Sequence, residues 1–169
     1  MAVVNTKATV VTNGDASSNT LTKLGIAGGR LKRVVGTVET ANGDDIASTY
    51  RICRVHSSWY IDTVKLYSDD IGTTTFADFG IYKTAADGGA VVDADFFGSA
   101  VSLKDGAISG TEIQHESAVY GVEDIEQPLW QALGLTADPG IWYDITATLT
   151  AAADAAGTIS LRVTYVDNN

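Results

Sequence analysis

Two segments near the carboxyl end of the chain alternate apolar and polar residues without interruption, and this alternation constrains the fold more than any other feature. The apolar positions are Ile141, Tyr143, Ile145, Ala147 and Leu149 in the first segment and Ile159, Leu161, Val163 and Tyr165 in the second. Because successive side chains of a β-strand point to opposite faces, a period of two predicts strands with one buried and one solvated face. This pattern is typical of an antiparallel sheet that covers a core.

Other segments of the chain have the composition of strands and are separated by turns rich in glycine, asparagine and aspartate. They comprise residues 34–39, 48–55, 59–67, 76–83, 96–103 and 111–116. About eight or nine short strands, with irregular connections and no sequence repeat, favour an all-β fold over a propeller or a solenoid. We expect an antiparallel two-sheet sandwich with jelly-roll wiring.

One short helix is expected before the last two strands. Ile125, Leu129 and Leu133 recur at four-residue spacing, which is typical of the buried face of a helix. Pro128 fits only the first turn, so we expect the regular helix over residues 126–133. The core of the sandwich is expected to form from Ile52, Ile61, Leu66, Phe79, Ile81, Ile145, Leu149, Leu161 and Val163.

The first 31 residues differ in composition from the rest of the chain. They are small and polar, and their apolar residues occur singly or in pairs, too sparsely to form a core of their own. We therefore expect an extended arm over residues 1–31 and a β-sandwich domain over residues 32–169. An alternative interpretation places one or two edge strands in the first segment, with Val10 and Val11 paired to a sheet.

The balance of charge bears on the partners of the protein. The chain carries 11 basic and 21 acidic side chains, a net charge of −10. This sign repels phosphate backbones and anionic membrane surfaces, so we expect neither nucleic acid nor a membrane as a partner. The densest group of cations is Arg30, Lys32 and Arg33. These residues either face a partner or are solvated side chains that balance neighbouring carboxylates.

Cysteine content and hydropathy indicate the compartment. Cys53 is the only cysteine, so no disulfide can form within the chain, which fits a reducing cytoplasm. The sequence does not begin with a charged leader and an apolar run, and no apolar run approaches the roughly 18 residues of a membrane span. We expect a soluble protein that is made in the cytoplasm and carries no cleaved signal.

No group of residues in the sequence predicts catalysis. His56 and His115 are far apart and do not form the His-x-His pair typical of jelly-roll metal sites. The chain contains no Gly-x-Ser-x-Gly motif, which hydrolases use to present a serine. Cys53 lies in the middle of an expected strand, where a buried and inert thiol is the favoured interpretation. We therefore expect no enzymatic activity and no cofactor.

Two weaker signals concern ligands. Asp87, Asp93 and Asp95 lie around a glycine-rich turn, and their oxygens are suited to calcium. Aspartate is also favoured in turns because its side chain accepts hydrogen bonds from nearby backbone N–H groups, and this explanation needs no metal. Trp142, on the polar face of its strand, is a candidate for stacking on a sugar.

Four segments, taken together, resemble a known family. They are residues 32–39, 80–95, 128–135 and 157–163, beginning with Lys-Arg-Val-Val-Gly-Thr-Val-Glu. They look like segments of small virion proteins of tailed bacteriophages, of the capsid cement or decoration type. The similarity covers most of residues 1–166 in order.

This resemblance implies a jelly-roll protein that acts as a dimer or trimer, binds the outside of an expanded capsid and clamps neighbouring major capsid subunits. It transfers no contact residues one by one. From the arm and its adjoining cations we expect the capsid-binding residues to be Val3, Val4, Val10, Val11, Leu21, Leu24, Arg30, Lys32 and Arg33. The alternative is a carbohydrate-binding module of a virion appendage, which would use Trp142.

Overall fold

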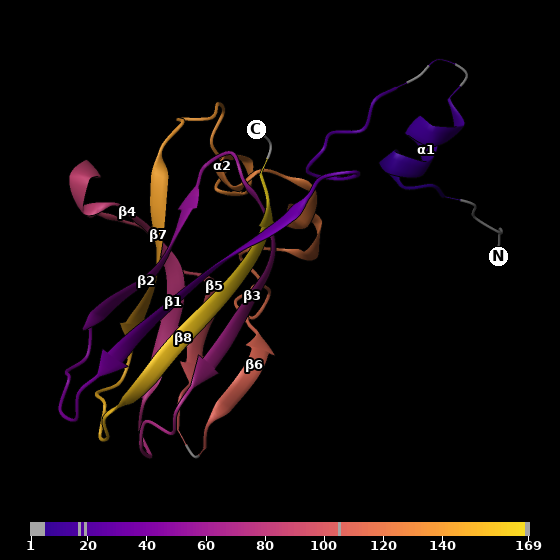
Figure 1. Ribbon diagram of the computed structural model, residues 1–169. Helices are drawn as coiled ribbons and strands as arrows, with labels where there is room; N and C mark the ends of the chain where they lie inside the picture. The colour runs from indigo at the N-terminus through magenta and orange to yellow at the C-terminus, as the bar shows by residue number, and fades with distance from the viewer. Residues whose placement is uncertain (1–5, 17, 19, 105, 168–169) are drawn as a thin grey trace, which may run out of the picture.

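The protein is an antiparallel β-sandwich with a projecting amino-terminal arm (Figure 1). The computed structural model describes residues 6–16, 18, 20–104 and 106–167. The strands are β1 Leu31–Thr40, β2 Thr49–His56, β3 Tyr60–Ser68, β4 Phe76–Lys83, β5 Val91–Ser102, β6 Ile108–Glu112, β7 Trp142–Leu149 and β8 Gly157–Val166. The helical segments are α1 Thr9–Asp15, the 3-10 turns η1 Ala85–Asp87 and η2 Val122–Glu126, and α2 Leu129–Ala132.

The strand order confirms the predicted sandwich and its jelly-roll wiring. One sheet has the order β1-β8-β3-β6 and the other has the order β2-β7-β4-β5. Every connection passes from one sheet to the other except the hairpin between β4 and β5. As a result the two carboxyl-terminal strands, whose alternation is the clearest in the sequence, occupy inner positions, with β8 between β1 and β3 and β7 between β2 and β4.

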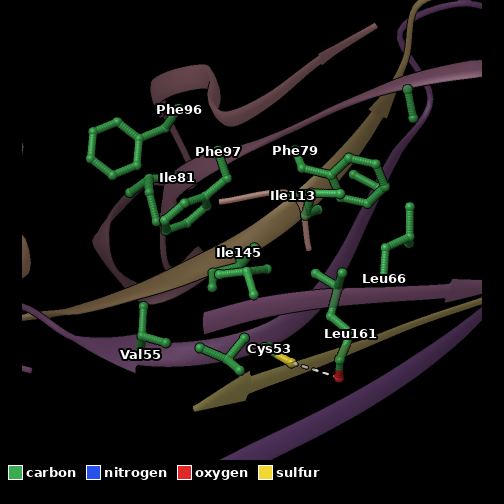
Figure 2. Packing of buried hydrophobic residues seen from close by; sticks show 14 of the residues in the cluster. Cys53, Val55, Leu66, Phe79, Ile81, Phe96, Phe97, Ile113, Ile145 and Leu161 are labelled. Atoms are coloured by element: carbon green, nitrogen blue, oxygen red, sulfur yellow. Dashed lines mark hydrogen bonds between the residues drawn. The ribbon is translucent and has the colours of Figure 1, made fainter. Parts of the chain in front are cut away.

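The core lies between the facing sheets, as expected (Figure 2). Eight of the nine residues predicted for it are at most 1% exposed: Ile61, Leu66, Phe79, Ile81, Ile145, Leu149, Leu161 and Val163. The Cys53 thiol on β2 donates a hydrogen bond across the sandwich to the carbonyl oxygen of Leu161 on β8, at 3.7 Å. Phe96, Phe97 and Tyr120, outside the predicted set, extend the core where their rings pack edge to face.

The ninth residue, Ile52, is only partly buried, because β2 contains a β-bulge. The pairing of β2 with β7 skips from Arg51 to Cys53, which leaves Ile52 as the extra residue. A bulge reverses the side-chain alternation that follows it. Cys53 and Val55 therefore enter the core, while Arg51 stays on the exposed face. A second bulge, between Ile61 and Thr63 of β3, brings Ile61 and Leu66 to the same face.

The predicted helix is shorter than expected and is divided. The 3-10 turn η2 ends at Glu126, and α2 begins after Pro128, whose ψ of 153° is extended. Proline has no backbone N–H and cannot continue the preceding turn, so it starts a new helix instead. Gly134, with φ of 73°, follows the end of α2. Leu129 is fully buried, whereas Ile125, expected on the same buried face, is 41% exposed.

Residues before β1 contribute no strand within the part of the arm that the structure describes. Val10 and Val11 lie in helix α1, so they do not form the edge strand considered as an alternative. Figure 1 shows α1 beyond the end of the sandwich where β1 begins. The seven-residue α1 was not predicted from the sequence. No helix among the described residues is long and apolar enough to cross a membrane.

The backbones of the two sheets come close together where β1 passes β2. Gly36 of β1 faces the carbonyl of Ile52, and a Cβ atom added at Gly36 would lie 1.8 Å from that oxygen. No side chain fits at this distance, so the contact requires glycine. The bulge at Ile52 and the glycine at position 36 therefore form one corner of the sandwich.

Replacing Gly36 with alanine is expected to destabilise the protein by about 1–3 kcal/mol, because the strands must separate to admit the methyl group. The matched control is Val35→Ala, which changes an exposed neighbour on the same strand and is expected to alter stability by less than about 0.5 kcal/mol. Urea unfolding followed by tryptophan fluorescence measures both variants. Equal midpoints for Gly36→Ala and the natural protein would show that the corner is not tightly packed.

Candidate binding surface at the arm end

The arm meets the sandwich through two glycines. A Cβ atom at Gly25 would lie 2.3 Å from a carbon of the Tyr60 ring, and one at Gly29 would lie 2.4 Å from Cγ1 of Val166. Both positions therefore allow the backbone of the arm to lie directly on side chains of β3 and β8. Beside this contact is a hollow of about 260 Å³, lined in part by Val10, Ile26, Tyr60 and Val166.

The apolar residues of the arm are exposed. Leu21 is 91% exposed, Leu24 57%, Val11 48% and Val10 38%, and α1 buries none of its residues. Large apolar side chains gathered on one segment are a common mark of an interaction surface. These are four of the predicted capsid-binding residues. Val3 and Val4, also predicted, lie outside the described residues.

The three predicted cations lie where the arm joins β1, at the rims of two hollows. Arg30 and Lys32 line a hollow of about 270 Å³ with Leu24 and Asp167. Lys32 and Arg33 line a second hollow, of about 680 Å³, along β1 and β8. Lys32 also forms an ion pair with Asp167 at 2.8 Å. The structure thus brings the basic group and Leu24 together at the arm end.

Sequence reasoning missed the contribution of β8 and of the connection before α2. Arg162, Thr164 and Tyr165 of β8 line the larger hollow beside Arg33. Val122, 69% exposed, and Ile125, 41% exposed, add apolar surface on the connection. Arg162 is visible in the sequence as an outward residue of an alternating strand, but only the pairing of β8 with β1 places it next to the predicted cations.

The main polar network of the β2-β7-β4-β5 sheet holds parts of the protein to one another. Asp144 of β7 is 5% exposed and accepts hydrogen bonds from Arg54 Nε at 2.8 Å and Arg51 Nη1 at 3.1 Å. The bond to Asp144 raises the pKa of Arg54. Arg51 also donates to the carbonyl oxygens of Lys83 and Gly89. The arginine therefore ties the β4–β5 connection to β2, and its donors are directed to protein atoms.

The three aspartates that are candidates for calcium binding do not converge on one site. Asp93 and Asp95 lie within strand β5 rather than in a turn, while Asp87 ends the 3-10 turn η1 and accepts a hydrogen bond from Thr84 Oγ1. In the part of the chain that the structure describes, no three His, Cys, Asp or Glu residues are grouped to hold a metal ion. Burial and a hydrogen bond with Asp95 raise the pKa of Asp93.

Five other aspartates lie in loops at the end of the sandwich opposite the arm, and we call them the acidic rim (Figure 1). It consists of Asp44, Asp45, Asp69, Asp70 and Asp154, and each accepts a hydrogen bond from a backbone N–H group. These aspartates are thus bound to backbone N–H groups, as aspartate in turns commonly is. Bonds from Thr73 lower the pKa of Asp154 to about 2.

The other candidates for chemistry have structural surroundings. Burial raises the pKa of the Cys53 thiol to about 12, so it is protonated at neutral pH and unreactive as a nucleophile. His56 ends β2 and its Nδ1 lies 2.8 Å from Ser58 Oγ. His115 Nδ1 lies 2.9 Å from the carbonyl oxygen of Tyr120. Each histidine therefore contacts its own local partner.

Trp142 is exposed, as predicted. The indole is 44% exposed and makes edge contacts with the rings of His56, at 4.9 Å, and Trp59, at 5.4 Å. Trp59 in turn stacks on Tyr165 at 3.7 Å and is 9% exposed. Trp59 is therefore used in packing, and Trp142 is the exposed member of this aromatic group.

Comparisons with known proteins concern the fold. No protein-family model matches the chain, and no curated protein matches it. Among solved structures, the protein is similar to a chain described as "Cyanophage Pam1 capsid asymmetric unit". The TM-score is 0.50 at 18% sequence identity, and the match covers 82% of this chain and 85% of that chain. At this identity the likeness shows a shared architecture over most of both chains.

Replacing Asp93 with asparagine is expected to stabilise the protein at pH 7. Because the pKa of Asp93 is higher in the folded than in the unfolded state, its ionisation disfavours folding at neutral pH. This cost disappears as the pH falls below the unfolded value near 3.8, where both states are protonated. Thermal unfolding should therefore show a higher Tm for Asp93→Asn at pH 7 and a smaller difference at pH 3.

The matched control is Asp45→Asn, which removes a carboxylate from the acidic rim and changes the net charge equally. A gain in Tm that is equal for both variants would attribute the effect to net charge and contradict a local cost at Asp93.

Proposed function

We propose that the protein is a structural component of a phage virion, which binds the outer surface of the capsid and stabilises contacts between major capsid subunits. The observation that carries the proposal is the arm, whose apolar side chains are exposed beside a sandwich that is already complete without it. Leu21 and Leu24 have no buried place in the monomer. The similarity in fold to a chain of a phage capsid asymmetric unit supports the same assignment.

The physical basis of binding is the burial of the arm on a partner. Fully burying a leucine or valine side chain contributes about 1.5–3 kcal/mol, against which the cost of ordering the arm must be set. A single arm therefore binds weakly. Many copies on one shell, or a dimer or trimer of this chain, add their contributions through multivalency. Arg30, Lys32 and Arg33 would orient the arm end toward an acidic partner, since the rest of the protein is acidic.

The direct experiment mixes the purified protein with expanded empty capsids of the phage that encodes it and sediments the shells. Stoichiometric co-sedimentation is expected, and a variant that lacks residues 2–29 should bind at least tenfold more weakly. That deletion leaves β1 intact, because β1 begins at Leu31. Thermal unfolding of the deletion variant checks that the sandwich is preserved.

A point variant tests the arm without shortening the chain. Leu24→Ser should weaken binding about threefold to tenfold, because one exposed leucine no longer buries on the shell. The control is Val92→Ser on β5, which removes a 40% exposed apolar side chain far from the arm in sequence. Absence of binding to the shells would overturn the function, whereas full binding without the arm would overturn only its mechanism.

A second candidate function is carbohydrate recognition by a virion appendage, which the exposed edge of Trp142 favours. A glycan array distinguishes it from the first. Specific binding that Trp142→Ala abolishes would support this candidate, and a blank array would remove it. Trp130→Ala, which changes a partly buried indole, serves as the control for altered folding.

A further inference from the structure

The outer face of the β1-β8-β3-β6 sheet is locally basic in an acidic protein. Arg33 on β1, Arg162 on β8 and Lys65 on β3 lie on three adjacent strands, and the pairing sets Lys65 opposite Arg162 and Arg162 opposite Val35. Arg33 and Arg162 are diagonal neighbours, at the separation of roughly 7–8 Å typical of such pairs. Lys65 is neutralised by Glu112 at 3.0 Å. The positive charge of this face therefore comes mainly from Arg33 and Arg162.

Neither arginine forms an ion pair with a carboxylate of the described residues. Arg162 lies over the ring of Tyr67, 5.6 Å from its centroid, which holds the guanidinium against the sheet with its N–H groups free for an acceptor. Arg51 and Arg54 differ in this respect, because both bind Asp144. The two unpaired guanidinium groups thus share one surface.

This surface is hollowed and partly apolar. The hollow of about 680 Å³ is lined by Leu31, Lys32, Arg33, Arg162, Thr164 and Tyr165. Leu31 is 61% exposed and Val35 is 56% exposed. β1 is the edge strand of its sheet, and no strand among the described residues pairs with its free edge. A surface with two arginines and exposed aliphatic groups matches a segment that carries carboxylates together with apolar side chains.

We propose that this hollow binds an acidic segment of a partner protein, through Arg33 and Arg162, and that on the proposed function the partner is the capsid subunit. Charge complementarity selects the occupant. Nucleic acid is disfavoured by the net charge of −10. A second copy is disfavoured for the same reason, and because the carboxylates of its acidic rim already accept backbone hydrogen bonds in their own turns.

The first experiment measures binding of fluorescently labelled poly-L-glutamate to the full chain at several salt concentrations. The natural protein should bind, and affinity should fall as salt rises. The double variant Arg33→Gln/Arg162→Gln should bind about tenfold more weakly, because each exposed ion pair raises the binding affinity by a few-fold. The control Lys83→Gln removes an exposed cation from β4 in the other sheet and should bind like the natural protein.

Three results would overturn the proposal. A loss of affinity in Lys83→Gln that is as large per removed charge as in the double variant would attribute binding to net charge. Tighter binding to double-stranded DNA than to poly-L-glutamate would assign the surface to nucleic acid. Self-association of the natural protein that the double variant abolishes, measured by sedimentation velocity, would assign the surface to a second copy.

The second experiment repeats capsid sedimentation with the same variants. Weaker co-sedimentation of the double variant, and competition by poly-L-glutamate, would show that the hollow contacts the capsid shell. Unchanged co-sedimentation would refute the hollow as the capsid contact and leave the proposed function standing. Absence of capsid binding by the natural protein would refute the proposed function, while the poly-L-glutamate measurement still decides the chemistry of the hollow.

Discussion

The structure depends on the insertion of the last strand, β8, between β1 and β3. This pairing gives β1 its only partner among the described strands and places Leu161 and Val163 in the core. Because the sandwich is completed from its carboxyl end, the chain before Leu31 is not needed for any described strand. The same pairing sets Arg162 beside Arg33, so one register defines both the fold and the basic surface.

The alternation of the sequence predicted the strands well where they are regular and less well where they are interrupted. β7 and β8 follow a strict period of two, and their inward residues were predicted correctly. Ile52, predicted for the core, is only partly buried and packs against it, because the bulge in β2 shifts the period by one. Nothing in the composition of Arg51-Ile52-Cys53 indicates a bulge. β-Bulges are set by the partner strand, which a single sequence does not specify.

The exposure of the candidate binding surface was predictable to the extent that its residues are close in sequence. Leu21, Leu24 and the cations of residues 30–33 are consecutive parts of one polar segment, and their exposure follows from that composition. Arg162 is separated from Arg33 by more than a hundred residues and joins it only through strand pairing. The preference of aspartate for turns favours a turn at Asp93 and Asp95, but both lie in β5, where Asp93 pairs with Ile81 of β4.

The central place of β8 also governs when the protein can fold during synthesis. Thr40 Oγ1 of β1 donates a hydrogen bond to the carbonyl oxygen of Gly157, 117 positions later. Strand β1 therefore cannot complete its pairing until β8 has been synthesised. Contacts of such long range are formed slowly and only after the intervening chain is available. The ribosome must therefore release β8 before the first sheet closes. Chains that stop before β8 leave β1 without a partner and are expected to be removed by proteases rather than to form a smaller sandwich.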